Sequence, residues 1–312
     1  MSGSGKPIRV EIVAPVHNRR DITLQCLRSI ANIDSTGLDV HTIIVDDGST
    51  DGTSEAIREQ FPYVEIVEGD GNLWFTAATN RGISAALEHD PDFILTINDD
   101  EVFAPQFLQR MIATAKANPR SVVGGLLLLW DEPHKVFQVA PKWDTWAGGY
   151  RHFTQQTVWT VPEKPWEVEL IVGNCVLFPA EAVRECGLMN ETRFPHYGDA
   201  EYTPRIRRKG WRLLIDPSAR VFCQPNTPPP SLRKMNLKKM LDRALLDLGN
   251  ANSVRKRFWA NWYGAPNPVS GLVALPVFYI RYLLGKNLEG RYADAVPEAP
   301  LKELYRTKVV GN

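Results

Sequence analysis

A cluster of acidic residues near position 100 has the composition of a site for chemistry on phosphates. Asn98, Asp99, Asp100 and Glu101 follow one another directly after a short apolar run. A strand that ends on adjacent carboxylates places them at the carboxyl edge of a sheet, where α/β folds bind ligands and where a hard divalent cation finds oxygen donors. The first hypothesis is therefore a metal-assisted reaction of a phosphate compound. The alternative is that these acids only cap the next helix. Glu101 is expected to be scaffolding on the side of that helix.

Two segments upstream also deliver polar groups to the ends of predicted strands. Pro15, His17 and Asn18 follow the first strand, and Asp46 and Asp47 follow the second within the sequence VDDGSTDGT. Such groups at one sheet edge can hold a base and a ribose, because a carboxylate accepts hydrogen bonds from both the ring N–H and the sugar hydroxyl. Taken alone, the second segment is often just a turn and a helix cap. Its place in the series of strand ends favours a nucleoside site.

The elements that must position these groups are predicted by short β-branched runs that alternate with helical stretches from residue 8 to about residue 130. This alternation is typical of a parallel sheet covered by helices, so we expect an α/β fold with a mostly parallel sheet. The predicted strands are 8–14, 41–45, 63–67 and 93–98, and the predicted helices are 21–32, 51–60, 77–88 and 104–118.

The second half of the chain has a different sequence pattern. Tryptophan-rich segments over 121–178 indicate mixed or antiparallel strands and loops. A helix is predicted over 199–209, followed by strands near 212–215 and 219–223. A proline run at 225–230 then breaks regular structure and marks a boundary.

We expect three parts: a disordered leader over 1–7, an α/β catalytic domain over 8–228 and a helical region over 229–312. In the helical region, basic residues are interleaved with Leu, Met, Phe and Trp over 232–262. This pattern suits a helix that lies on an anionic membrane surface. It equally suits a solvated helix that packs on the catalytic domain, or a contact with a second copy of the chain in a homo-oligomer.

Charge, cysteine content and the length of apolar segments indicate which classes of protein this chain does not belong to. Lysine plus arginine (36) equals aspartate plus glutamate (36), so no overall positive field indicates nucleic acid as a partner. The four cysteines form no CxxC pair, which indicates neither a zinc site nor a disulfide framework and fits a reducing cytosol. The apolar stretch 271–284 is shorter than the roughly 20 residues of a spanning helix. We therefore expect a cytoplasmic protein with peripheral contact at the inner face of the cell membrane.

Taken in order, the motifs of the chain resemble glycosyltransferase family 2, most closely its rhamnosyltransferase-like bacterial branch. They are APVHN, VDDGSTDGT, GNLWF with NRG, NDDEV and GDAEY, and they extend over about residues 8 to 225. The resemblance implies the GT-A fold and an inverting transfer of a sugar from a UDP, dTDP or GDP donor. It also implies a Mn²⁺ or Mg²⁺ ion that stabilises the charge on the departing diphosphate. The expected donor-binding residues are Pro15, His17, Asn18, Asp46, Asp47, Asn72, Asn80, Arg81 and Asn98.

The resemblance also implies the metal ligands and the catalytic base. Asp99 matches the last acid of the family's metal motif, and Asp100 is the second candidate ligand. Many relatives carry a histidine that can complete the metal site where this chain has Cys223 and Gln224. Asp199 matches the general base, which takes the proton of the acceptor hydroxyl. The alternative for Asp199 is an N-cap of the helix that follows.

Two residues next to Asp199 depart from the family pattern. Gly198 stands where the family usually has a first acid, and Glu201 replaces a final aspartate. The first change is expected to alter the pKa of the base or its acceptor contacts. The expected acceptor-binding residues are Gly173, Asn174, His196, Tyr197 and Glu201.

The resemblance leads us to expect an acceptor that is a growing glycan or a lipid-linked sugar, in bacterial surface polysaccharide or glycolipid synthesis. Two other functions stay open. A nucleotidyltransferase or nucleotide-sugar hydrolase would use the same sheet edge and metal, but it would have no use for a base that faces a sugar hydroxyl. A glycan- or nucleotide-binding protein without catalysis is conceivable because of Gly198 and Cys223.

Overall fold

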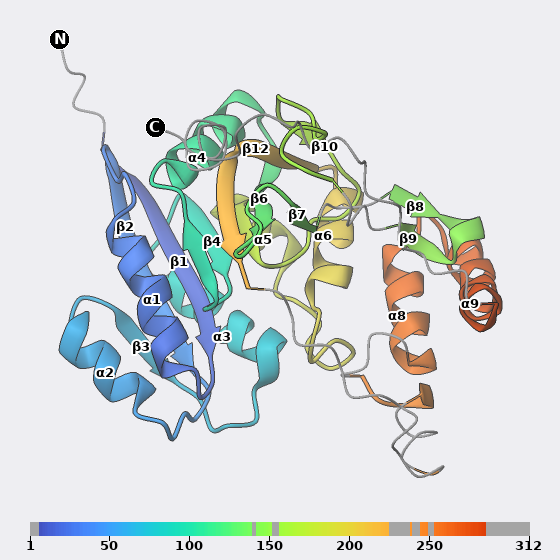
Figure 1. Cartoon of the computed structure of the whole chain (residues 1–312), viewed down its shortest axis with the longest axis horizontal. Helices are drawn as coiled ribbons and strands as arrows, with labels where there is room; N and C mark the ends of the chain where they lie inside the picture. The colour runs from blue at the N-terminus through green and yellow to red at the C-terminus, as the bar shows by residue number, and fades with distance from the viewer. Residues whose placement is uncertain are drawn as a thin grey trace.

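The computed structural model describes residues 6–138, 142–151, 156–224, 238, 244–248 and 253–284, and it is built around one large sheet (Figure 1). Along the sheet lie, in this order, β10 (Trp166–Glu167), β12 (Arg212–Cys223), β6 (Ser121–Leu129), β11 (Cys175–Pro179), β4 (Phe93–Ile97), β1 (Ile8–Val16), β2 (Leu38–Asp46) and β3 (Glu65–Glu68).

The part of the sheet formed by β4, β1, β2 and β3 is entirely parallel. β1 pairs with β2 and with β4, and β2 pairs with β3. The continuous Val and Ile runs of these strands explain the arrangement, because a parallel strand is covered on both faces. The predicted α/β fold with a mostly parallel sheet is confirmed, and each predicted strand is found, with β2 starting three residues earlier than expected at Leu38.

The other part of the sheet mixes directions, as expected for the second half of the chain. β6 and β12 are parallel, whereas β11 is antiparallel to both of its neighbours, β4 and β6. Two short strands, β5 (Glu101–Phe103) and β7 (Val136–Gln138), add antiparallel pairs to β12 and β6. The two strands predicted near 212–215 and 219–223 form one strand, β12, with an irregularity between Asp216 and Arg220.

Helices cover both faces of the sheet and bury a hydrophobic core on each. They are α1 (Arg20–Ala31), α2 (Thr53–Gln60), α3 (Trp74–Glu88), α4 (Phe107–Ala117), α5 (Ala180–Cys186) and α6 (Asp199–Arg208). Leu27 of α1 and Phe107 of α4 belong to one core, and Ile83 of α3 and Ile206 of α6 belong to the other. Because the helices occupy the faces, the ends of the strands are left to form a site.

Two further helices, α8 (Val254–Gly264) and α9 (Pro268–Leu283), stand at one end of the molecule beside a two-stranded sheet of β8 (Lys142–Asp144) and β9 (Gly149–Arg151) (Figure 1). α8 packs on α6 and on α9, and α9 also contacts β9. Of the interpretations of the basic helical region, packing on the catalytic part of the chain therefore applies to α8. None of the described helices is both long and apolar enough to span a bilayer.

Two predicted boundaries are corrected by the structure. The helix expected over 104–118 begins at Phe107, because Glu101–Phe103 first form β5 against β12. Glu101 is thus fully buried in a strand and does not lie on the side of a helix. The helix expected from residue 77 begins at Trp74. The proline run at 225–230 and most of the leader and of 229–252 lie outside the described residues, so the division of the chain at residue 228 stays a prediction.

Candidate active site

Two cavities lie next to each other at the carboxyl ends of β1, β2 and β4. The first, here called the strand-end cavity, has a volume of about 340 Å³. The second, here called the helix cavity, has a volume of about 460 Å³ and reaches α6 and α8. Phe75 and Asn98 line both cavities, so the two are contiguous.

The structure brings many of the predicted site residues together around these cavities and leaves others outside. The strand-end cavity is lined by Pro15, His17, Asp47, Asn98 and Asp99 of the predicted set. The helix cavity is lined by Asn98, Gly173, Asn174, His196, Tyr197 and Asp199 of that set. The predicted residues that line neither cavity are Asn18, Asp46, Asn72, Asn80, Arg81, Asp100 and Glu201.

Asp47 shapes the strand-end cavity by holding the loop before α3. Its carboxylate accepts hydrogen bonds from the backbone N–H groups of Gly71 (2.8 Å), Leu73 (3.0 Å) and Trp74 (3.2 Å). Asp47 therefore positions the loop that forms one wall of the cavity, and its carboxylate is largely committed to that loop.

Asp46 has a different place from the one expected of a nucleoside ligand. Its carboxylate accepts hydrogen bonds from the backbone N–H of Ser49 (2.9 Å) and from the hydroxyl of Ser54 in α2. It is almost fully buried and stabilises the turn that leads into α2. For Asp46, the structure supports the role of a turn and helix cap.

Trp74 is an exposed aromatic side chain on the wall of the strand-end cavity, with 60% of its surface accessible. Its backbone has φ 57°, a left-handed conformation that a bulky residue rarely adopts. The hydrogen bond to Asp47 and an edge-to-face contact with His196, with ring centroids 4.7 Å apart, hold it there. Strained backbone of this kind gathers at ligand-binding sites, and an exposed indole offers a surface on which a base or a sugar can stack.

His17 and Asn18 join the ends of β1 and β2. His17 donates from Nδ1 to the backbone carbonyl of Asp47 (2.6 Å) and accepts at Nε2 from the Asn18 amide (3.0 Å), which assigns the tautomer with the proton on Nδ1. The Asn18 carbonyl oxygen accepts from the backbone N–H of Thr50 (2.7 Å). Asn18 thus stabilises the scaffold behind the cavity, while the ring of His17 lines it.

Asn80 and Arg81 were expected near the donor, and the structure places them elsewhere. The buried Asn80 side chain donates to the carbonyl of Met189 (2.9 Å) and to Glu191 (2.9 Å), and it accepts from the N–H of Met189 (2.9 Å). Arg81 donates to the carbonyl of Glu68 (3.0 Å) at the end of β3. Asn80 therefore anchors the segment that leads to Asp199. Asn72, also expected near the donor, is exposed on the loop before α3.

Asp99 and Asp100 lie side by side at the end of β4, joined by the guanidinium of Arg19. Arg19 donates to Asp99 Oδ1 (2.8 Å) and to Asp100 Oδ2 (3.0 Å), and Thr23 donates to Asp99 Oδ2 (3.2 Å). Burial raises the pKa of Asp99 to about 6, and the charge of Arg19 acts against this rise. Arg19, which also lines the strand-end cavity, is thus a positive group held where two carboxylates converge.

Cys223 does not take the place of a third metal ligand. Its thiol is almost completely buried and donates to Glu101 (3.7 Å). Burial raises the pKa values of the Cys223 thiol and of the Glu101 carboxyl, so both favour their neutral, protonated forms. Gln224 is half-buried at the end of β12.

Asp199 lies at the start of α6 and faces the helix cavity. Its carboxylate accepts from the backbone N–H of Gly173 (3.1 Å). A Cβ at position 173 would lie 2.9 Å from the Cβ of Asp199, so only glycine lets the two segments approach this closely. Burial raises the pKa of Asp199, and the charge of Lys256 acts in the opposite direction. A carboxylate with a raised pKa in a cavity is suited to accept a proton.

The two departures around Asp199 have structural reasons. A Cβ at Gly198 would lie 2.8 Å from Thr76 and 2.9 Å from Met189, so no acid fits there. The carboxylate of Glu201 is buried and paired with Arg205 one helical turn later. Glu201 therefore holds α6 together, and its expected contact with the acceptor stays a prediction.

Lys256 is a functional candidate that sequence analysis did not single out. It extends from α8 into the helix cavity, is only 3% exposed and donates to the backbone carbonyl of His196 (2.9 Å). Its ammonium lies 4.6 Å from the ring centre of Tyr197 and 4.5 Å from that of Phe194. Burial lowers the pKa of Lys256 to about 8, while Asp199 favours its charged form.

Sequence reasoning also missed Arg19, although a signal was present. Arg19 directly follows the motif APVHN and was the nearest base to a predicted strand end. Lys256 had no such signal, because it is one of many basic residues in the C-terminal region and only the packing of α8 on α6 brings it to Asp199.

The amino-acid sequence is similar to a known protein family and to proteins of known activity. The model of the family "Glycosyl transferase family 2" matches residues 11–178, which include the ends of β1, β2 and β4. An N-acetylglucosaminyl-diphospho-decaprenol L-rhamnosyltransferase of Mycobacterium tuberculosis is 26% identical over 205 residues, which are 59% of this chain and 66% of that protein. The match thus spans slightly less than two thirds of the curated relative.

Two solved structures share the fold at low sequence identity. A structure of GalNAc-T7 with UDP, GalNAc and Mn²⁺ superposes with a TM-score of 0.59 at 13% identity and covers 89% of this chain and 55% of that one. A structure of residues 1–349 of TarS from S. aureus superposes with a TM-score of 0.54 at 12% identity. The match covers 89% of this chain and 72% of that one. These likenesses confirm the expected α/β fold of the GT-A type.

Proposed function

We propose that this chain, a member of glycosyltransferase family 2, transfers a sugar from a nucleoside diphosphate sugar to an acceptor hydroxyl and inverts the anomeric configuration. One observation carries the proposal: the cavity at the strand ends is contiguous with the cavity that contains the carboxylate of Asp199. A donor in the first cavity would have its sugar at the junction, beside Asn98 and Phe75. An acceptor in the second cavity would then approach the sugar from the side of Asp199.

The residues suggest a single displacement. Asp199, as the carboxylate, takes the proton of the acceptor hydroxyl, and the oxygen attacks the anomeric carbon while the bond from that carbon to the diphosphate oxygen breaks. Asn98 is suited to orient the sugar, because its buried side-chain oxygen lies at the junction and has no hydrogen-bond partner. The hydrogen bond from Gly173 keeps the base in place. Trp74 and His17 form walls against which the nucleoside can pack.

Asp99 and Asp100 fit a hard divalent cation such as Mg²⁺ or Mn²⁺. They offer oxygen donors only, and Mg²⁺ is usually held by one or two carboxylates together with the phosphates of a substrate. In the described part of the chain, no third acid, histidine or cysteine has a ligand atom close enough to join them. When bound, such an ion would stabilise the negative charge of the departing diphosphate as a Lewis acid. Arg19 would then have to release at least part of its contact with the two carboxylates.

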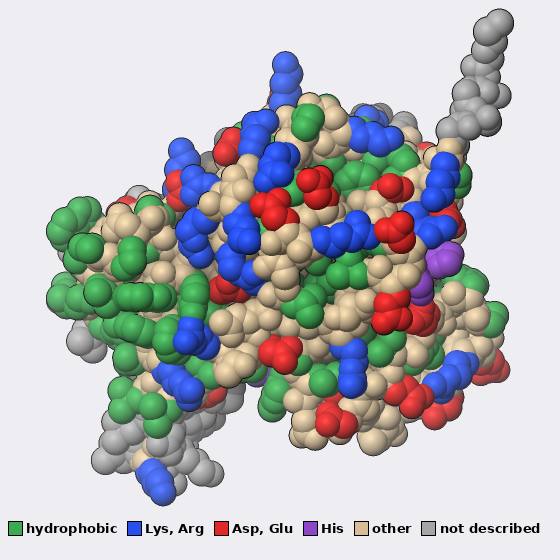
Figure 2. Space-filling view, turned by 180° about the vertical axis from the view of Figure 1, so that it is seen from behind, with side chains coloured by type: hydrophobic (Ala, Val, Ile, Leu, Met, Phe, Trp, Pro, Cys, Tyr) green, Lys and Arg blue, Asp and Glu red, His purple; other side chains and the backbone are tan. Residues whose placement is uncertain are grey.

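The acceptor we propose is a lipid-linked sugar or a growing glycan at the inner face of the cell membrane. The name of the mycobacterial relative contains the lipid-linked sugar N-acetylglucosaminyl-diphospho-decaprenol. In this chain α8 lines the helix cavity and packs on α9, whose outer side is apolar, so a lipid-linked acceptor could reach Asp199 from that side. The hydrophobic side chains gathered at this end of the molecule are at the left in Figure 2.

The test of the proposed function separates donor binding from transfer. UDP-, dTDP- and GDP-sugars are screened by thermal shift with and without Mn²⁺, and the binding donor is then assayed with lipid-linked and soluble acceptors. Asp199→Asn is expected to keep donor binding and to lower the transfer rate by about 10²- to 10⁴-fold, because the amide cannot take the proton. Glu181→Gln, an exposed acid on α5, is the control and should keep full activity. Failure of every donor to shift the melting temperature would contradict the proposal.

The same experiment separates the alternatives. If Asp199→Asn leaves nucleotide turnover unchanged, the chain is a nucleotidyltransferase or a hydrolase, since neither needs a base that faces a sugar hydroxyl. If a donor binds but no acceptor receives its sugar, the chain is a binding protein without catalysis.

A further inference from the structure

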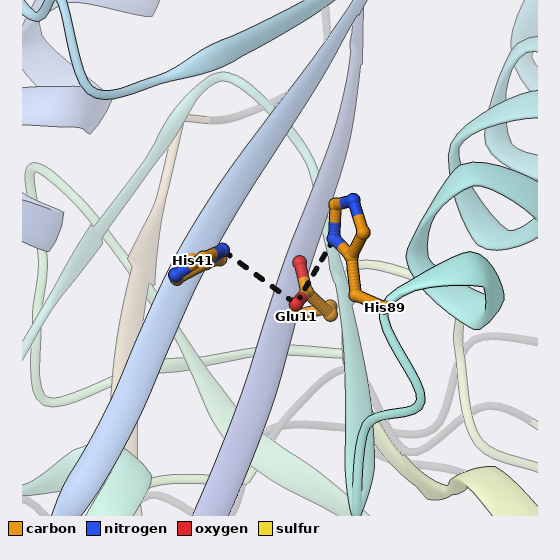
Figure 3. Close-up of side chains that lie close together, drawn as sticks. All are labelled: Glu11, His41 and His89. Carbon is orange, nitrogen blue, oxygen red and sulfur yellow. Dashed lines mark ion pairs between the residues drawn. The ribbon is translucent and has the colours of Figure 1, made fainter.

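A second group of potential ligands lies at the opposite end of the parallel strands. Glu11 of β1, His41 of β2 and His89, directly after α3, point toward one another (Figure 3). Glu11 precedes the end of β1 at Val16 by five residues, which corresponds to about 17 Å along the strand. The group is therefore separate from the two cavities and from Asp99 and Asp100.

Glu11 is the central residue of this group. Its side chain is fully buried, and neither carboxylate oxygen has a hydrogen-bond partner. The buried Nδ1 of His89 also lacks a hydrogen bond, although it lies 3.2 Å from Glu11 Oε1. A buried carboxylate without hydrogen bonds is costly, and buried charges are normally paired or bound to a metal. The burial of Glu11 and of His89 Nδ1 side by side without hydrogen bonds therefore needs an explanation.

The separations of the ligand atoms are compatible with binding of a small metal ion. Glu11 Oε1 lies 3.2 Å from His89 Nδ1 and 3.8 Å from His41 Nδ1, and the three ligand atoms all lie within 4.8 Å of one another. Zinc ligands at about 2.0–2.1 Å in a tetrahedral arrangement are separated by about 3.4 Å. The two shorter separations bracket this value, so small side-chain movements suffice to hold an ion.

Each histidine has a carboxylate near its second ring nitrogen. His41 Nε2 lies 3.7 Å from Asp39, and His89 Nε2 lies 3.6 Å from Glu65. A histidine that binds a metal with one nitrogen almost always donates its other N–H to a carboxylate, a carbonyl or water, which fixes its tautomer. In this group, both rings have Nδ1 toward Glu11 and Nε2 toward a second carboxylate.

We propose that Glu11, His41 and His89 bind a divalent transition metal of the Zn²⁺ type. Two imidazoles and one carboxylate favour such an ion over Mg²⁺, which prefers oxygen ligands only. The His41 side chain is 57% exposed, so the ion can enter from solvent and keep a water molecule as its fourth ligand. The ion would tie β1, β2 and the connection after α3 together at the end of the sheet away from the catalytic cavities.

The competing explanation is a network of ion pairs, in which protonated histidines neutralise Glu11 without any metal. Direct metal binding distinguishes the two. Tag-free protein carrying Asp99→Asn and Asp100→Asn, which removes the acidic pair at the end of β4, is titrated with Zn²⁺ by calorimetry and with Co²⁺ by visible absorption. We expect one ion per chain, with the absorption bands of Co²⁺ bound to nitrogen and oxygen ligands in a site of low coordination number.

Three variants in the same background test the ligands. His41→Ala and His89→Gln should each weaken Zn²⁺ binding by at least about tenfold and reduce the Co²⁺ bands, whereas His134→Gln, a histidine outside the group, should change neither. His41→Ala alone suffices if His89→Gln does not fold, because His41 is largely exposed. A featureless Co²⁺ spectrum, or Zn²⁺ affinity that is the same in the His41 and His134 variants, would overturn the proposal in favour of the ion-pair network.

Discussion

Lys256 and Asp199 form a pair of opposite charges at the helix cavity, and each changes the protonation of the other. Burial raises the pKa of Asp199 and lowers that of Lys256 to about 8, and their attraction acts against both shifts. Lys256 carries its charge below pH 8, and Asp199 acts as a base above its own pKa. The proposed reaction should therefore slow as the pH falls below the pKa of Asp199, and the charge of Lys256 should shift this loss to lower pH.

We expect Lys256→Gln to affect the reaction mainly at low pH. Without the ammonium, the pKa of Asp199 rises further, and each unit of rise lowers the fraction of reactive carboxylate about tenfold on the acid side. The ratio of wild-type to variant kcat/KM should therefore be largest at the acid end of the pH profile and approach one well above the pKa of Lys256 of about 8, where wild-type Lys256 is neutral as well. Lys256→Arg keeps the positive charge, so the decrease of kcat/KM at acid pH should be the same as in the wild type. An equal loss at every pH would show that Lys256 acts only through packing.

Arg19 is the second residue whose charge bears on the proposed reaction. It occupies the space between Asp99 and Asp100, where we propose that Mn²⁺ or Mg²⁺ binds. We expect Arg19→Gln to bind Mn²⁺ about ten times more tightly than the wild type in the absence of donor, because an internal cation no longer competes. Electron paramagnetic resonance of free Mn²⁺ measures this affinity. Arg20→Gln is the matched control, since Arg20 pairs with the exposed Asp21. Unchanged or weaker Mn²⁺ binding in Arg19→Gln would contradict competition.

At the scale of elements, α9 has one side that is apolar and exposed. Val269, Leu272 and Ile280 of α9 and Leu284 directly after it are 70%, 49%, 57% and 65% exposed, while Ala274 and Phe278 on the other side are buried. Their helical spacing places the exposed side chains on one face. A helix with such a face can lie in the interface of a bilayer. This is the structural basis for the proposed membrane contact next to the helix cavity.

We expect the double variant Leu272→Ser with Ile280→Ser to bind vesicles of anionic phospholipid about tenfold more weakly than the wild type. Burial of each side chain in lipid contributes on the order of 1.5–3 kcal/mol when complete, and less at an interface. Flotation of protein with vesicles measures the bound fraction, and thermal melting checks that the variant is folded. Tyr63→Ser, which removes an apolar side chain 67% exposed before β3, should leave binding unchanged. Equal flotation of all three proteins would rule out α9 as the membrane contact.

For the whole molecule, the two ends of the parallel strands carry different groups of side chains. The carboxyl ends of β1, β2 and β4 form the strand-end cavity, and the opposite ends carry the group Glu11, His41 and His89. The helix cavity is completed from outside the sheet by α8, which packs on α6. A site for proposed sugar transfer thus depends on segments that lie more than 200 residues apart, such as the loop after β1 and α8.

Much of the parallel half of the fold follows from local sequence patterns. Strands and helices repeat their apolar residues every two and every 3.6 residues, and parallel strands place their carboxyl ends at one edge. These rules predict that Pro15, His17, Asp47 and Asp99 lie together, as the structure places them. The fold of the second half was harder to predict from the sequence, because mixed strand directions and the irregularity in β12 depend on pairing between distant segments.

Residues at the same strand ends nevertheless differ in what they contact, and sequence patterns do not separate them. Asp46 and Asp47 are neighbours in one motif, yet Asp46 stabilises the turn before α2 and Asp47 holds the wall of the cavity. The exclusion of an acid at Gly198 and the charge of Lys256 beside Asp199 arise from packing between α3, α6 and α8. Local patterns place residues on elements, but burial and pairing of charges depend on which elements meet in space.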